Sequence, residues 1–140
     1  MALKVKGVDV WVASIQDRPG AVAEKLQGLA DAGAQLEFVI SRRSPERPGT
    51  GVVFLTPLRG ARQTAAAAQL EFRKTTHSSI RIEGADKPGM GAKITEALAA
   101  GGINLRGVSA AAIGKRFVAY IALDTPADAA KAIRILKKLA

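Results

Sequence analysis

Cysteine is absent from the sequence, so neither a disulfide framework nor a thiolate metal site can form. This absence fits a reducing compartment. Aromatic residues make up only 4% of the chain, which leaves few side chains on which a base or a flat cofactor could stack. With 48% hydrophobic and 24% charged residues, the composition is that of a globular protein whose core is built mostly from small aliphatic side chains.

Long apolar runs and a concentrated charge are also missing. No stretch approaches the roughly 20 apolar residues of a membrane-spanning helix, and residues 1–6 carry charges where a signal peptide is apolar. We therefore expect a cytoplasmic protein that does not bind membranes. The net charge of +9 is spread evenly, with 11 Lys and Arg against 7 Asp and Glu in residues 1–76, and 10 against 5 in residues 77–140. This distribution argues against a basic nucleic-acid-binding tail.

Residues that perform catalysis or bind metals are scarce. The single histidine, His77, lies beside two serines, but nothing around it supplies the acid and oxyanion site of a hydrolase. Carboxylates are scattered rather than spaced as metal ligands, and the segment from Gly84 to Gly89 lacks the Lys-Ser/Thr ending of a P-loop. We expect a protein that is not an enzyme, with no catalytic residue, no metal and no cofactor.

An internal repeat at an offset of 69 residues organises the chain. Asp17-Arg18-Pro19-Gly20 recurs as Asp86-Lys87-Pro88-Gly89. The same offset aligns Leu29 with Leu98, Gly33 with Gly102, Leu36 with Leu105 and Val39 with Val108. Because this register continues far beyond one Pro-Gly pair, we predict two copies of one module, residues 1–76 and residues 77–140.

Each copy predicts the order strand, helix, strand, strand, helix. Alternating β-favouring residues run into each Asp-x-Pro-Gly turn, after which apolar residues at helical spacing continue to a glycine stop. We expect the proline in the first helical turn and the Asp as a possible cap of the helix. The expected strands are 8–15, 35–41, 51–58, 79–83, 104–110 and 116–123, and the closing helices are 61–70 and 126–139.

This order gives an α+β sandwich in which two helices cover one face of an antiparallel sheet. A fourth strand is missing from the end of the second copy, whereas residues 71–76 can supply it in the first. Residues 3–6 align with 72–75 at the same offset. We therefore predict that the N-terminal segment supplies the missing strand.

The motifs resemble those of the ACT domain, a regulatory module that often binds amino acids. That family has the same order of elements, an Asp/Asn-x-Pro-Gly turn, and a Gly-x-Asn-Ile/Leu segment opening the second strand. Gly102-Ile103-Asn104-Leu105 fits this segment, and Gly33-Ala34-Gln35-Leu36 fits it with Gln in place of Asn. The resemblance covers nearly the whole chain. It implies two tandem ferredoxin-like ACT-type sandwiches in a regulatory protein.

The turns are the candidate ligand sites. A helix N-terminus offers free amides and the positive end of its dipole to an amino acid's carboxylate, while an Asp faces its ammonium group. Helix capping alone would also explain the Asp. The resemblance adds the residue that opens the second strand as a ligand contact. The expected contacts are Asp86, Gly89, Met90 and Asn104 in the second copy, and Asp17, Gly20, Ala21 and Gln35 in the first.

Two other functions compete with amino-acid sensing. The RNA-recognition fold has the same element order, and Phe117-Val118-Ala119-Tyr120 matches the end of its third-strand motif. However, Arg116 replaces the required glycine, so nucleic acid is not the expected partner. A module that binds a protein partner without any ligand is the second alternative.

The first strand also predicts an association. Trp11, Ala13 and Ile15 are expected to face the helices, which leaves Val8, Val10 and Val12 on the open face of the sheet. We expect another sheet to cover these valines, from the other copy or from a second chain in a homo-oligomer. A fully solvated Val10 would refute this expectation.

Overall fold

A computed structural model describes residues 2–139, which divide into two compact units with separate cores. One unit comprises Asp9–Thr75. The other comprises the chain from Thr76 onward together with the N-terminal segment that ends at Val8.

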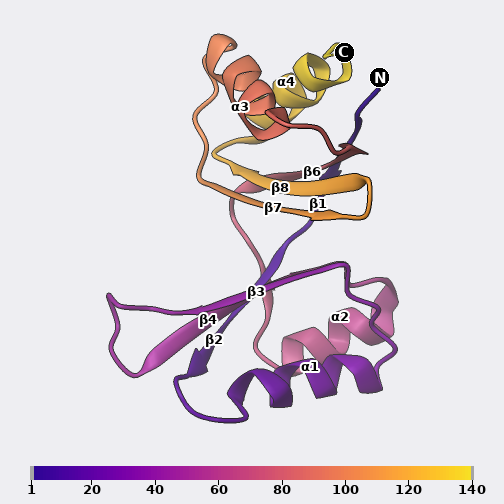
Figure 1. The fold of residues 1–140 in the computed structure, drawn as a ribbon. Coiled ribbons are helices and arrows are strands. Elements are labelled where there is room, and N and C mark those ends of the chain that lie inside the picture. Colours follow the sequence, from indigo (N-terminus) through magenta and orange to yellow (C-terminus); the bar gives the residue numbers. More distant parts are fainter. Residues whose placement is uncertain (1, 140) are drawn as a thin grey trace. The chain divides into compact units, whose positions relative to one another are not determined.

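The first unit is an antiparallel sheet of four strands in the order β3-β4-β2-β5. Helices α1 and α2 lie on one face of this sheet (Figure 1). The elements along the chain are β2 (Trp11–Gln16), α1 (Ala21–Asp31), β3 (Phe38–Arg43), β4 (Thr50–Thr56), α2 (Gly60–Gln69) and β5 (Arg73–Lys74).

The second unit repeats this architecture with the strand order β1-β6-β8-β7. Helices α3 and α4 cover one face of the sheet (Figure 1). The elements are β1 (Lys4–Val8), β6 (Ser78–Ala85), α3 (Met90–Ala100), β7 (Gly107–Ile113), β8 (Arg116–Leu123) and α4 (Pro126–Lys137). Each unit is thus a ferredoxin-like α+β sandwich.

The N-terminal strand completes the second sheet, as predicted. Strand β1 pairs antiparallel with β6, in the position that β5 takes beside β2 in the first unit. Leu3 and Val5 are buried in the core of the second unit. A side chain at Gly84 would place its Cβ 2.7 Å from Leu3 Cδ2 and 3.0 Å from Phe117 Cε1, so this position must stay small. The division expected from the sequence, 1–76 and 77–140, assigns β1 to the first copy, whereas in the structure it packs with the second.

The predicted core face of the first repeat is confirmed. Ala13 is fully buried between the sheet and the helices, and Trp11 and Ile15 pack against the same cluster. Val8 differs from the prediction, because it belongs to β1 and pairs with Ser79 instead of sharing a strand with Val10. Val10 is 6% exposed, so the refuting outcome of a solvated Val10 is not observed. The expectation that another sheet covers Val10 stays a prediction.

The second strand of each repeat begins three residues later than predicted, at Phe38 and Gly107. In the second repeat the Asn104 Oδ1 atom accepts a hydrogen bond of 3.0 Å from the Leu105 amide, within a segment that precedes the ladder. Asn104 therefore precedes its strand.

Candidate ligand-binding site at the second Asp-x-Pro-Gly turn

The two turns are built by backbone hydrogen bonds, without the Asp cap suggested by the sequence. Gly20 and Gly89 are the N-cap residues, with φ of 87° and 84°, and neither helix has a side-chain cap. This left-handed conformation is one that glycine adopts at little cost. The helices start at Ala21 and Met90, so each proline lies before the helix and not in its first turn. Capping therefore does not account for Asp17 or Asp86.

Each Asp is instead held by its backbone against a hairpin. The Asp86 amide donates to the Lys115 carbonyl oxygen at 2.8 Å, and the Asp17 amide donates to the Gly49 carbonyl oxygen at 3.0 Å. This arrangement fixes the backbone at the mouth of the turn and leaves the carboxylates available for other contacts.

The sequence suggested Gly89 and Met90 as the free amides at the start of α3, but the Met90 amide is hydrogen-bonded. The Met90 amide donates to the Lys87 carbonyl oxygen at 3.3 Å, and the Ala21 amide makes the equivalent bond to Arg18. Within residues 2–139, the amides of Gly89, Gly91 and Ala92 have no hydrogen-bond partner. The helix N-terminus thus still offers several donors to an anion.

Ion pairs neutralise the turn of the first repeat. Arg43 Nε lies 2.9 Å from Asp17 Oδ2, and Arg18 reaches over the first turn of α1 to Glu24 at 2.8 Å. The hydrogen bond from Arg18, reinforced by its charge, lowers the pKa of the Glu24 carboxyl. A guanidinium group therefore already occupies the place at Asp17 where a ligand's ammonium group would bind.

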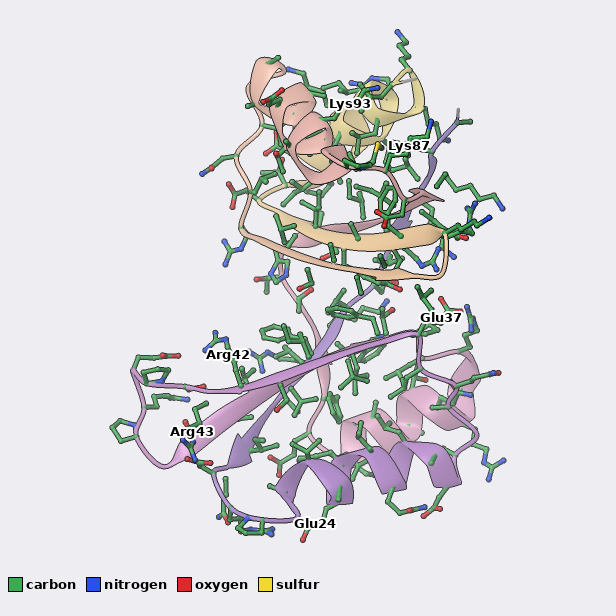
Figure 2. The ribbon with its side chains drawn as sticks, viewed as in Figure 1. Glu24, Glu37, Arg42, Arg43, Lys87 and Lys93 are labelled. Atoms are coloured by element: carbon green, nitrogen blue, oxygen red, sulfur yellow. The ribbon has the colours of Figure 1, made fainter. Side chains whose placement is uncertain are left out.

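The turn of the second repeat carries different residues at these positions. The positions aligned with Arg43 and Glu24 are Ala112 and Lys93. In the part of the chain that the structure describes, Asp86 and Lys87 form no ion pair. Figure 2 labels four of these residues, Glu24 and Arg43 in the first repeat, and Lys87 and Lys93 near the start of α3 in the second. The second turn thus combines an unpaired carboxylate with an unpaired ammonium group.

A cavity of about 290 Å³ opens beside this turn, between the start of α3 and strand β7. Asp86, Lys87 and Gly89 line it from the turn, Gly91 and Thr95 from α3, and alanines from β7. Sequence reasoning missed this cavity, although a signal was present. Small residues stand there where the first repeat has larger ones. Gly91, Thr95 and Ala112 align with Val22, Leu26 and Arg43.

The structure does not bring Asp86 and Asn104 of one repeat together. Asp86 lies at the end of the sheet where Ile113 pairs with Arg116, whereas Asn104 precedes Gly107, which pairs with Ala122 at the opposite end. The seven residues of β7 alone span roughly 20 Å at the usual rise of a strand. Asp17 and Gln35 are separated in the same way in the first repeat. One repeat by itself therefore cannot place both residues on one small ligand.

The residues that suggested RNA binding have structural roles. Phe117 is buried in the core between sheet and helices, so it is not available for stacking on a base. Tyr120 lies on the other face of β8, where Arg81 Nε donates to its hydroxyl oxygen at 3.1 Å. Arg81 and Arg116 both bind Glu83, with nitrogen to oxygen distances of 2.9 and 3.2 Å. The RNA alternative is not favoured by this arrangement.

Between residues 2 and 139, no helix is both long and apolar enough to cross a membrane. The same residues contain no group of three or more His, Cys, Asp or Glu side chains that could hold a metal ion.

Residues 79–140 match the family model of the ACT domain, so the second repeat is an ACT domain. For the first repeat the likeness is one of fold. Among curated proteins, none matches the sequence.

Solved structures of low sequence identity share the two-repeat fold. Protein BT0572 from Bacteroides thetaiotaomicron matches with a TM-score of 0.78 and 17% identity, over 96% of this chain and 89% of that one. The regulatory subunit of aspartate kinase from Thermus thermophilus matches with a TM-score of 0.65 and 18% identity, over 99% and 97%. A structure of aspartokinase alpha and beta subunits gives 0.66 and 19%, over 99% and 97%.

Proposed function

We propose that this chain is a regulatory protein, without catalytic activity of its own, whose second repeat binds a free amino acid or a similar small carboxylate. The observation that carries the proposal is the unpaired Asp86 beside Lys87 and the free amides of α3. A zwitterionic ligand complements this arrangement, because its ammonium group pairs with Asp86 while its carboxylate binds Lys87 and the helix N-terminus.

A regulatory role is also supported by the relatives in fold. Two of the matched structures are described as a regulatory subunit of aspartate kinase and as aspartokinase subunits. We take from them a regulatory role, and no particular ligand or target.

The distance between Asp86 and Asn104 is compatible with this proposal if two chains associate. Strand β7 has a sheet neighbour only on the β8 side within residues 2–139, and its seven residues include no charged side chain and no proline. Such an edge is suited to pairing with another strand. Antiparallel pairing of two β7 edges about a two-fold axis would bring Asn104 of one chain to the Asp86 end of the other. We therefore propose a homo-oligomer with a shared site.

Thermal melting in the presence of single free amino acids tests the proposal. A ligand at about 100 times its dissociation constant stabilises the fold by roughly 2.7 kcal/mol. We expect Asp86→Asn to remove this gain and Asp17→Asn, the matched variant of the first repeat, to retain it. Because neither Asp caps a helix, both variants should melt close to the wild type without ligand. If no amino acid at millimolar concentration shifts the melting of the wild type, the ligand-free interaction module takes the place of the sensor.

A mixing experiment tests the shared site. Asp86→Asn and Asn104→Ala chains should each fail to respond to the amino acid that stabilises the wild type. After they are mixed and allowed to exchange, a hybrid dimer has one site with both residues intact, so part of the response should return. A mixture that stays silent, although exchange is shown by mass spectrometry, would contradict a site shared between chains.

A further inference from the structure

The cavity beside the second turn has a size that fits one class of ligand. We propose that it is the side-chain pocket of the amino-acid site and that it selects amino acids with an apolar side chain, such as leucine, methionine or phenylalanine. This inference rests on the proposed function and adds the ligand class to it.

The volume limits the ligand to a small metabolite. Pockets that enclose drug-sized ligands and cofactors have volumes of roughly 300–1,000 Å³. The cavity, at about 290 Å³, lies at the lower end of this range. A nucleotide would not fit inside it, whereas one amino-acid side chain would.

The lining sets the polarity. Ile94, Phe117 and Ile121 form the inner wall. The Thr95 hydroxyl belongs to its own helix, because it donates to the Gly91 carbonyl oxygen at 2.8 Å. A charged or amide side chain would lose its water without gaining partners there, which costs free energy, whereas an apolar side chain gains by burial.

The charged groups stand only at the mouth. Asp86 and Lys87 line the same cavity from the turn, and the free Gly91 amide lies on its wall. An amino acid can therefore leave its charged backbone groups at Asp86, Lys87 and the start of α3 while its side chain enters the cavity. The geometry combines, in one place, a zwitterion-binding mouth and an apolar interior.

The aligned positions of the first repeat carry larger side chains. Val22 and Leu26 stand where the second repeat has Gly91 and Thr95, and both pack against the core of the first unit. Transfer of these larger residues to the aligned positions of the second repeat should therefore fill the cavity.

Substitution of Gly91 by Val transfers one of these residues. A Cβ at Gly91 meets no atom within 4 Å, so the new side chain enters open space without disturbing the fold. The matched control is Ala99→Val, which places the same side chain further along α3, at an exposed position outside the cavity and away from the free amides. Thr95→Leu is a second, independent variant that fills the cavity. Each variant is melted with leucine, methionine, phenylalanine, aspartate and lysine.

We expect the apolar amino acids to give the largest shifts with the wild type and with Ala99→Val. Gly91→Val and Thr95→Leu should melt like the wild type without ligand and bind the apolar amino acids at least about tenfold more weakly, which corresponds to 1.4 kcal/mol. If aspartate or lysine gives the largest shift and both cavity-filling variants still bind it, the pocket assignment is overturned while the sensor stands. If no amino acid binds, the proposed function fails as well. Lost self-association in Gly91→Val with unchanged amino-acid binding would assign the cavity to a second copy and would also overturn the inference.

Discussion

Truncation of Val5 to Ala tests whether the N-terminal strand stabilises the second repeat and not the first. Val5 is 7% exposed, pairs with Ile82 and belongs to the core cluster of the second unit. The substitution removes two buried carbon atoms, which lowers the transfer free energy of burial by about 1.6 kcal/mol. Incomplete closure of the resulting space adds to this loss, so we expect a decrease of about 2 kcal/mol in the free energy of unfolding of the second unit.

Hydrogen exchange measured by mass spectrometry resolves this effect by location. A loss of about 2 kcal/mol accelerates exchange through unfolding of the unit by roughly 30-fold. We expect this change in β6 and β8, with no change in β2 and β4. Lys6→Ala, on the exposed face of the same strand, is the control and should alter stability by less than about 0.5 kcal/mol. Faster exchange in β2 and β4 with unchanged β6 and β8 would show that β1 belongs to the first repeat.

Three further predictions concern a helix cap, the pH dependence of stability and nucleic-acid binding. Thr125 Oγ1 accepts a hydrogen bond of 3.0 Å from the Asp128 amide at the start of α4, so Thr125→Ala should cost about 1 kcal/mol in chemical denaturation. Hydrogen bonding to Arg81 and Arg116 lowers the pKa of the Glu83 carboxyl. The ionised carboxylate therefore contributes fully to the stability of the fold above the usual carboxyl pKa, and this contribution is lost as the pH falls through the depressed pKa. Glu83→Gln should flatten this acid limb in melts recorded against pH, and an unchanged limb would exclude Glu83 as its source. Binding to RNA or DNA should be weak and nonspecific, and submicromolar affinity near physiological ionic strength in a filter-binding assay would reverse this expectation.

The fold could be predicted in large part because the chain repeats. The register that aligns Leu29 with Leu98 fixes corresponding helices, and counting strands in each copy exposes the missing one at the C-terminus. The structure confirms that the N-terminal segment fills this place, with Lys4 opposite Glu83 in the ladder. Each of these inferences rests on apolar periodicity and strand number, which the sequence contains directly.

Details that depend on backbone conformation could not be predicted from the sequence. The Asp-x-Pro-Gly pattern suggested a cap, but Gly89 takes a left-handed conformation and becomes the N-cap itself, which leaves Asp86 outside the helix. The apolar periodicity does not mark the start of β7 either, which lies at Gly107, three residues later than expected. The predicted site residues therefore lie at two ends of one sheet.

The cavity and the ion pair at Asp17 could have been found by a closer comparison of the two copies. Arg43, which pairs with Asp17, aligns with Ala112, so the second repeat lacks the corresponding cation. The replacement of Val22 by Gly91 likewise indicates where the second repeat has space. Similarities between the copies predicted the fold, whereas differences at aligned positions mark the turn that we propose binds a ligand.

The proposed function requires that the second turn binds an amino acid and that the first does not. A titration of the isotope-labelled protein with leucine, followed by amide chemical shifts in solution NMR, distinguishes the two turns residue by residue. We expect the largest shifts at Gly89, Gly91 and Ala92, with Gly20 and Ala21 of the first repeat unchanged. Shifts centred on the first turn, or none in either turn with leucine or any other amino acid at millimolar concentration, would contradict it.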